Sequence, residues 1–411
     1  MRTLDILIEE LDGSLWVAAI SSRELQGLEV DPVHEQVRWG AIYWAKVTRI
    51  DKAMDAAFLD LDGENTGILH NKDVRIEQKN GAVKKGGKEE IGKILTPGQM
   101  VAVQAKSGYL AREEDYLLPS EEKSALVSMD ITLQGRYLIF SPIMPDNRVS
   151  SRIRDKKLRR QLLRMLNATE SIKGCILRAA AANTQTDILR REGKIMGAMW
   201  EQIQAHLSGD APALIMEGPD ALQRTVSDHA GKTIDRIEIV TMEQFEHVEE
   251  WCEIFAPDLV TKIRPVELND PHAELALFEE RDILSKIEDL FQPYTILKQG
   301  GNIIIQETTA LTAIDVNRGT DGRPAMEVNL DAAGEIGRQL RLRNLGGIIV
   351  VDFLKMRGKK DHKTLLAALE TIFEKDPCTV QIHGITGLGL VEITRKRRTP
   401  ALQERFSTAF E

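Results

Sequence analysis

The fold is decided by the run Leu311-Thr312-Ala313-Ile314-Asp315-Val316-Asn317, a short apolar segment that closes on an acid and an amide. A second apolar run, Ile348-Ile349-Val350-Val351, closes on Asp352. Runs this short and this apolar are typical of buried strands. Two such strands can place both carboxylates side by side at one edge of a sheet. Opposed carboxylates are costly there unless they are protonated or a cation neutralises them.

The spacing of these polar residues favours a metal site. Asp315 and Asn317 are two positions apart, so in a strand both side chains leave the same face. Mg²⁺ takes oxygen ligands, usually one or two carboxylates completed by water and substrate phosphate. Asp315 and Asp352 would supply the carboxylates, and Asn317 could donate to a phosphate. Most Asp-x-Asn triplets are turn or cap residues, so the spacing alone leaves that alternative open.

Length and composition predict a globular protein of several domains. A chain of 411 residues is too long for one ordinary core, and two to four domains or subdomains are expected. The N-terminal apolar stretch contains acids, which predicts neither a signal peptide nor a membrane anchor and favours the cytoplasm. Cys175, Cys252 and Cys378 lie far apart and form no CxxC, so neither a disulfide framework nor a structural zinc site is predicted.

Charge is distributed unevenly along the chain. The net charge is −9, but residues 147–194 carry 13 Lys and Arg against 4 acids, and residues 338–398 carry 13 against 6. Residues 211–290 carry 7 basic residues against 19 acids. Two basic segments on an acidic body fit a protein that binds nucleic acid on one face. The alternative is that these segments are solvated helix faces without a partner.

Two segments have recognisable patterns of secondary structure. Residues 39–124 contain short apolar runs around a Gly/Lys-rich loop at 79–88, which indicates a small β-barrel of the OB type, a fold that commonly binds single strands. From residue 302 onward strand and helix alternate in the α/β manner. In that segment Asn329 and Asp361 are expected to cap two helices.

Three segments resemble the RNase E/G family of endoribonucleases. They are residues 311–319, residues 329–343 and the stretch Leu345-Gly346-Gly347-Ile348-Ile349-Val350-Val351-Asp352-Phe353. The matching motifs are long, and a looser similarity runs through nearly the whole chain.

The resemblance implies Mg²⁺-dependent cleavage of single-stranded RNA that leaves 5′-phosphate and 3′-hydroxyl ends, in rRNA processing or mRNA decay. Mn²⁺ is an alternative to Mg²⁺ at this site. By motif match Asp315 and Asp352 hold the metal, while Asn317 orients Asp315 and the phosphate.

The family also implies an architecture of mixed α+β and α/β subdomains: a split RNase H-like subdomain with an inserted OB-fold, a sensor subdomain and a DNase I-like catalytic subdomain. The expected bounds are 1–38 for the first RNase H-like segment, 39–124 for the OB-fold, 125–210 for the 5′-sensor-like subdomain, 211–274 for the second RNase H-like segment and 275–411 for the catalytic subdomain.

Several positions expected to contact RNA match the family incompletely. Phe58 matches one of two aromatics of the OB-fold, Ile68 stands in place of the other, and Lys123 matches a lysine. In the sensor, Arg178 is followed by Ala179 rather than threonine, and Gly387 stands where a second arginine is expected. We therefore expect weak dependence on a 5′-monophosphate. Phe58 as a barrel-core residue, Lys123 as a plain surface charge and Arg178 paired with an acid are the open alternatives.

The basic residues near the expected site are further candidates. Arg338 and Arg341, together with Arg343 and the run 395–398, could bind RNA phosphates, or could be solvated charges. In the family a cysteine pair after the catalytic domain shares zinc between subunits. The sequence has no cysteine after Cys378, so we expect a monomer or an oligomer without a zinc link.

Three functions are considered, and the weakest is a DNA-directed phosphodiesterase, which rests only on the expected shape of the last domain. The other two are of different classes. One is an endoribonuclease, favoured by the intact set of Asp315, Asn317 and Asp352. The other is a non-catalytic RNA-binding or ribosome-maturation factor on the same fold, which the substitutions at Ile68, Ala179 and Gly387 leave open.

Overall fold

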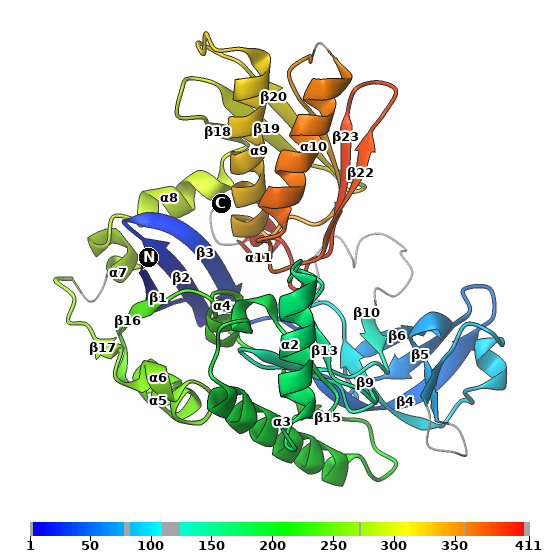
Figure 1. Ribbon diagram of the computed structural model, residues 1–411. Helices are drawn as coiled ribbons and strands as arrows, with labels where there is room; N and C mark the ends of the chain where they lie inside the picture. Colours follow the sequence, from blue (N-terminus) through cyan, green and yellow to red (C-terminus); the bar gives the residue numbers. More distant parts are fainter. Residues whose placement is uncertain (1–2, 78–82, 109–123, 271–272, 357, 407–411) are drawn as a thin grey trace. The chain divides into compact units, whose positions relative to one another are not determined.

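A computed structural model describes residues 3–77, 83–108, 124–270, 273–356 and 358–406 (Figure 1). The chain divides into two compact units. Unit 1 contains Asp31–Asp235 and Met242–Ile263, with Met1, and unit 2 contains Arg2–Val30, Arg236–Thr241 and Arg264–Glu411. Among the described helices, none is both long enough and apolar enough to cross a bilayer.

Described strands of unit 1 form a closed barrel. They follow the order β4-β5-β6-β10-β9, and β9 pairs with β4 to close the ring. Buried aliphatic side chains fill its interior. The strands are β4 (Ile42–Asp51), β5 (Ala56–Asp60), β6 (Thr66–His70), β9 (Met100–Ala105) and β10 (Ala125–Ser128). The barrel is consistent with an OB-like subdomain, and its strand β10 lies beyond residue 124, the expected end of this subdomain.

Three further short strands, β7, β8 and β15, belong to the same unit as the barrel. Strands β7 (Arg75–Glu77) and β8 (Val83–Lys85) pair antiparallel as a separate two-stranded sheet. Residues 211–274 are expected with the N-terminal strands, but their first strand, β15 (Ala213–Met216), pairs with β4 of the barrel instead.

A second sheet of unit 1 lies against two amphipathic helices. Its order is β11-β12-β14-β13, and apolar residues of α2 and α3 pack on it. Asp155 caps α2 by accepting from the backbone N–H groups of Lys157 and Leu158. The elements are β11 (Leu133–Gln134), β12 (Leu138–Phe140), β13 (Arg148–Val149), β14 (Cys175–Leu177), α2 (Lys156–Asn167) and α3 (Thr186–His206). Unit 1 also contains α4 (Ala221–Asp228), α5 (Met242–Phe255) and α6 (Pro257–Val260).

The N-terminal strands share a sheet with a distant segment, as a split subdomain would require. The order is β17-β16-β1-β2-β3. Asp12 and Gly13 form the two-residue turn between the first two strands, both with positive φ (48° and 76°), as the Asp-Gly pair predicts. The elements are β1 (Leu4–Leu11), β2 (Ser14–Ser21), β3 (Glu24–Asp31), β16 (Ile234–Ile239) and β17 (Ile263–Pro265), followed by α7 (Ala276–Glu280) and α8 (Leu284–Glu288).

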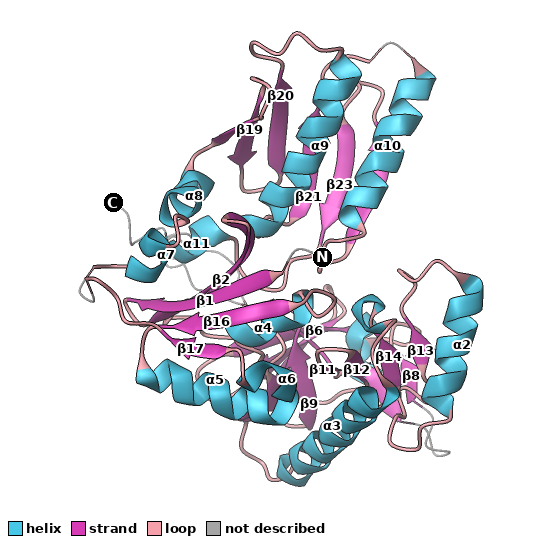
Figure 2. Cartoon of the chain, turned by 60° about the vertical axis from the view of Figure 1, so that its left-hand side comes forward, coloured by secondary structure: helices cyan, strands magenta, loops and turns pink. Residues whose placement is uncertain are grey.

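The remaining sheet of unit 2 carries the acids singled out above. Its described strands follow the order β18-β19-β20-β21-β23-β22, and α9 and α10 lie side by side over one face (Figure 2). Buried residues of both helices form one core with this face of the sheet. The elements are β18 (Tyr294–Ile296), β19 (Asn302–Glu307), β20 (Thr312–Asn317), α9 (Ala325–Leu342), β21 (Gly347–Asp352), α10 (Lys359–Phe373), β22 (Val380–Ile385), β23 (Val391–Arg395) and α11 (Leu402–Phe406).

The two expected helix caps are wrong. Helix α9 begins after Pro324, and Asn329 lies inside it, fully buried. Helix α10 begins after Gly358, and Asp361 lies in its first turn. In both cases the helical pattern extends a few residues further toward the N-terminus than the polar residue suggests.

Candidate active site

Asp315 and Asp352 lie opposite each other on neighbouring strands. Strands β20 and β21 are parallel, and their register pairs these two residues. Neighbouring strands are about 4.8 Å apart, so the two α-carbons have about that separation. Both acids are exposed, while Ile314 and Val351 beside them are buried. The acids therefore leave the face of this sheet opposite α9 and α10, which we call the open face.

Asn317 holds one of the two carboxylates. Its side-chain amide donates to Oδ2 of Asp315 over 2.9 Å, from the same face of β20 two residues along. This contact orients the Asp315 carboxylate. The sequence predicted the proximity of all three residues, and the structure brings them together.

A glycine pair supports Asn317 from the neighbouring hairpin. Gly300 and Gly301 form the turn between β18 and β19, and Gly300 has a φ of +99°. A Cβ at Gly301 would lie 2.8 Å from the carbonyl oxygen of Asn317, so a side chain here would displace the end of β20. This pair was missed in the sequence, although a Gly-Gly doublet between strands is a turn signal.

A buried asparagine fixes the segment that follows Asp352. Asn329 donates from Nδ2 to the carbonyl oxygen of Leu354 over 2.8 Å, and its Oδ1 accepts from the N–H of Leu354 over 2.9 Å. A side-chain amide that bonds both backbone groups of one residue holds the chain as a neighbouring strand would. Asn329 thus positions the chain directly after β21. This role was missed in the sequence, where Asn329 has the pattern of a helix cap.

The acidic pair fits a hard divalent cation with an incomplete protein shell. In the described residues, no group of three or more His, Cys, Asp or Glu side chains is arranged to hold a metal. Two carboxylates from adjacent strands are the usual protein contribution to Mg²⁺, since water and substrate phosphate complete its shell. A zinc site would need three or four nitrogen or sulfur donors, which the described residues of this face do not offer.

The arginines of α9 lie on the other side of the sheet. Arg338 makes an ion pair with Glu335 (2.9 Å), and Arg341 donates to the carbonyl oxygen of Gly337 within the same helix. Burial lowers the pKa of Arg341. Because α9 covers the face opposite Asp315 and Asp352, the structure does not bring these arginines to the acidic pair. Their binding to RNA stays a prediction.

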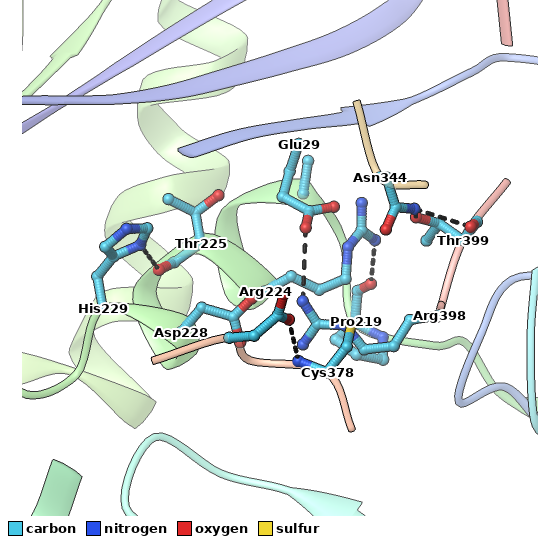
Figure 3. A network of polar contacts seen from close by, with 12 residues as sticks. Glu29, Pro219, Arg224, Thr225, Asp228, His229, Asn344, Cys378, Arg398 and Thr399 are labelled. Carbon is cyan, nitrogen blue, oxygen red and sulfur yellow. Dashed lines mark hydrogen bonds and ion pairs between the residues drawn. The ribbon is translucent and has the colours of Figure 1, made fainter. Parts of the chain in front are cut away.

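Other basic residues expected near the site are already engaged within unit 2. The guanidinium of Arg343 is buried and donates to Gln339 Oε1 and to the carbonyl oxygen of Gln292. Arg395 is buried with Asp376. Arg398 pairs with Glu29 over 3.5 Å, as Figure 3 shows. These side chains anchor the fold of this unit.

In the barrel, Phe58 lies beside Ile68, the residue at the position where the second aromatic was expected. Phe58 on β5 is 8% exposed and lies opposite Ile68 on β6. The guanidinium carbon of Arg49 lies 4.0 Å from the Phe58 ring centroid, a cation–π contact. The ring is therefore partly covered by this arginine, and Ile68 adds no second stacking surface. Lys123 lies outside the described residues.

Arg178 has structural partners. One of its terminal nitrogens donates to the carbonyl oxygen of Gly135 over 3.0 Å, and the other lies 3.7 Å from a carboxylate oxygen of Asp228. Pairing with an acid, one of the two alternatives for this residue, is therefore observed. Gly387 lies in the turn between β22 and β23, with open space where its Cβ would be.

Comparison with known proteins shows the family to which the chain belongs. Residues 132–398 match the Ribonuclease E/G family. The chain belongs to this family. It is 33% identical over 401 residues to Ribonuclease E of Haemophilus influenzae, covering 95% of this chain and 41% of that protein. It is 29% identical over 417 residues to Ribonuclease G of Salmonella typhimurium, covering 98% of this chain and 81% of that protein. The same comparison with Ribonuclease E of Escherichia coli gives 33% over 402 residues, 95% of this chain and 36% of that protein.

Proposed function

We propose that this chain is an endoribonuclease that cleaves single-stranded RNA with Mg²⁺ and leaves 5′-phosphate and 3′-hydroxyl ends. The observation that carries the proposal is the register of Asp315 with Asp352 on the open face. Membership of a family whose named relatives are ribonucleases supports the reaction class. We further propose a cytoplasmic location for this protein.

Each residue of the site has a distinct role in this proposal. Asp315 and Asp352 hold the cation, for which Mn²⁺ could substitute. Bound there, the metal would lower the pKa of a coordinated water and neutralise charge on the phosphate. Asn317 keeps the Asp315 carboxylate in one orientation through its 2.9 Å hydrogen bond. Both acids are exposed, so a flexible strand can approach them without any opening of the core.

The proposal is tested by cleavage of a 5′-labelled, AU-rich single-stranded oligoribonucleotide with and without Mg²⁺. We expect cleavage only with the metal, since two bare carboxylates cannot supply a nucleophile or neutralise the phosphate. The products should be substrates for ligation at a 5′-phosphate and extension at a 3′-hydroxyl. RNA binding without cleavage at any Mg²⁺ or Mn²⁺ concentration would instead support a non-catalytic RNA-binding factor.

A second expectation concerns the 5′ end of the substrate. Arg178 is committed to Gly135 and Asp228, and Ala179 and Gly387 offer no hydrogen-bond donor from a side chain. A missing charge-assisted hydrogen bond is worth roughly 1.5–3 kcal/mol. We expect kcat/KM on oligonucleotides with a 5′-phosphate and with a 5′-hydroxyl to differ by less than about tenfold. A larger preference for the phosphate would refute this weak dependence.

A further inference from the structure

An aromatic side chain stands on the open face of the catalytic sheet. Tyr294 in the edge strand β18 is 50% exposed, and Ile296, two residues along, is 71% exposed. Thr295 between them faces the helical side, where it accepts a hydrogen bond from Arg343 (3.3 Å). Strand alternation therefore places Tyr294 and Ile296 on the same face as the acids.

The register of the sheet puts Tyr294 in line with the acidic pair. Tyr294 lies opposite Ile304, Ile304 lies opposite Asp315, and Asp315 lies opposite Asp352. Residues opposite one another in a ladder share a face, so these four side chains form one row across the sheet. At about 4.8 Å per strand, Tyr294 is about 10 Å from Asp315.

This distance suits the bases that flank a reacting phosphate. Successive nucleotides of a stacked strand advance about 3.4 Å, and more when the strand is extended. A base about one to three nucleotides from the scissile phosphate would therefore lie over Tyr294. Side chains stand roughly perpendicular to a sheet, and exposed aromatics on sheet faces stack bases in other RNA-binding folds.

The surroundings of the ring favour a flat, weakly polar ligand. Ile304 is half-buried and Ile296 is exposed, so Tyr294 stands among apolar side chains that water solvates poorly. In the described strands of the barrel, Phe58 is the aromatic that matches the family, and Arg49 covers its ring. A second stacking site on the catalytic sheet would supply base contacts that the Ile68 replacement removes from the barrel.

We propose that Tyr294 is a stacking platform for one base near the scissile phosphate, and so forms a base subsite of the catalytic sheet. The proposal rests on the proposed function, because it requires RNA at Asp315 and Asp352. The ring contributes to ground-state and transition-state binding alike, so its loss should raise KM and leave kcat nearly unchanged.

The test measures RNA binding in the Asp352→Asn background without metal, by fluorescence anisotropy of a labelled single-stranded oligonucleotide. Tyr294→Ala should weaken binding about tenfold, and Tyr294→Phe, which keeps the ring, should bind like the parent. Ile348→Ala is the control and should bind like the parent, since it removes exposed apolar area from the open face, on β21, without removing a ring and away from Tyr294.

A scan of single abasic sites locates the base. In the parent protein, an abasic site at one position of the oligonucleotide should weaken binding about as much as Tyr294→Ala does. In the Tyr294→Ala protein, the same abasic site should weaken binding no further. Equal binding by Tyr294→Ala and the parent, or abasic penalties that are independent of Tyr294, would overturn the subsite. Absence of cleavage by the wild-type protein would refute the proposed function, which separates the two failures.

Discussion

Replacing Asp352 with asparagine is expected to lower kcat for RNA cleavage by on the order of 10³-fold while the protein stays folded. The change keeps the size of the side chain and removes one of the two charges that would hold the cation. Asp352 is exposed, so its replacement leaves no cavity and no unpaired buried group. Initial rates on the labelled oligonucleotide, at several Mg²⁺ concentrations, measure the effect.

Glu392 provides a matched control for this substitution. It is exposed on β23 and lies opposite Val350, so it is on the open face with Asp352. Glu392→Gln removes the same charge from the same face and should change kcat less than about twofold, because Glu392 is not in the acidic pair. Equal cleavage by Asp352→Asn and wild type would remove the assigned mechanism. Partial recovery of Asp352→Asn at high Mg²⁺ would identify the lost carboxylate as a metal ligand.

The largest effect on stability is expected at a buried ion pair of unit 2. Asp376 is fully buried, and its carboxylate accepts from Nε (2.9 Å) and Nη2 (3.1 Å) of Arg395, which is 3% exposed. Asp376→Leu leaves the arginine charge buried without its counter-charge. Breaking a buried pair from one side costs about 3–5 kcal/mol, so the melting transition of the protein should fall by on the order of 10 °C.

The double variant Asp376→Leu/Arg395→Met tests the cause of that loss. Replacing both members of a buried pair with apolar residues is often neutral, so the double variant should recover much of the stability. Asp187→Asn, which breaks the exposed pair with Arg190, should change the melting temperature by less than about one degree. A double variant as unstable as Asp376→Leu would show that packing, and not the uncompensated charge, is responsible.

The acidic pair was predictable because its signal is local. Each acid ends an apolar run, and residue alternation in a strand decides which face its side chain takes. The register that brings Asp315 opposite Asp352 needed only that the two runs be neighbours, which a single intervening helix favours. The family motifs point to the same residues.

The basic residues were not predictable in the same way. Arg395, Arg397 and Arg398 form a conspicuous run in the sequence, yet they pair with Asp376, Glu404 and Glu29. These acids lie 19, 7 and 369 positions away in the chain, and the packing of unit 2 decides which arginine each of them meets. The pairing of β15 with β4 likewise joins residues far apart in the chain.

Asn329 illustrates a third kind of limit. An asparagine ahead of an apolar helical run has the pattern of a cap. Pro324 starts the helix earlier, and the backbone of Leu354 satisfies the asparagine amide instead. Sequence alone cannot distinguish these two uses, because the partner of the side chain is a loop that follows the next strand.

Because Asp315 and Asp352 are spaced by the hydrogen bonding of two adjacent backbones, their separation depends little on which aliphatic side chains fill the core beneath them. Substitutions in that core can therefore lower the melting temperature of the protein while the kcat of the folded molecules stays unchanged. Stability and catalytic rate can thus change independently of each other when the core of this sheet is substituted.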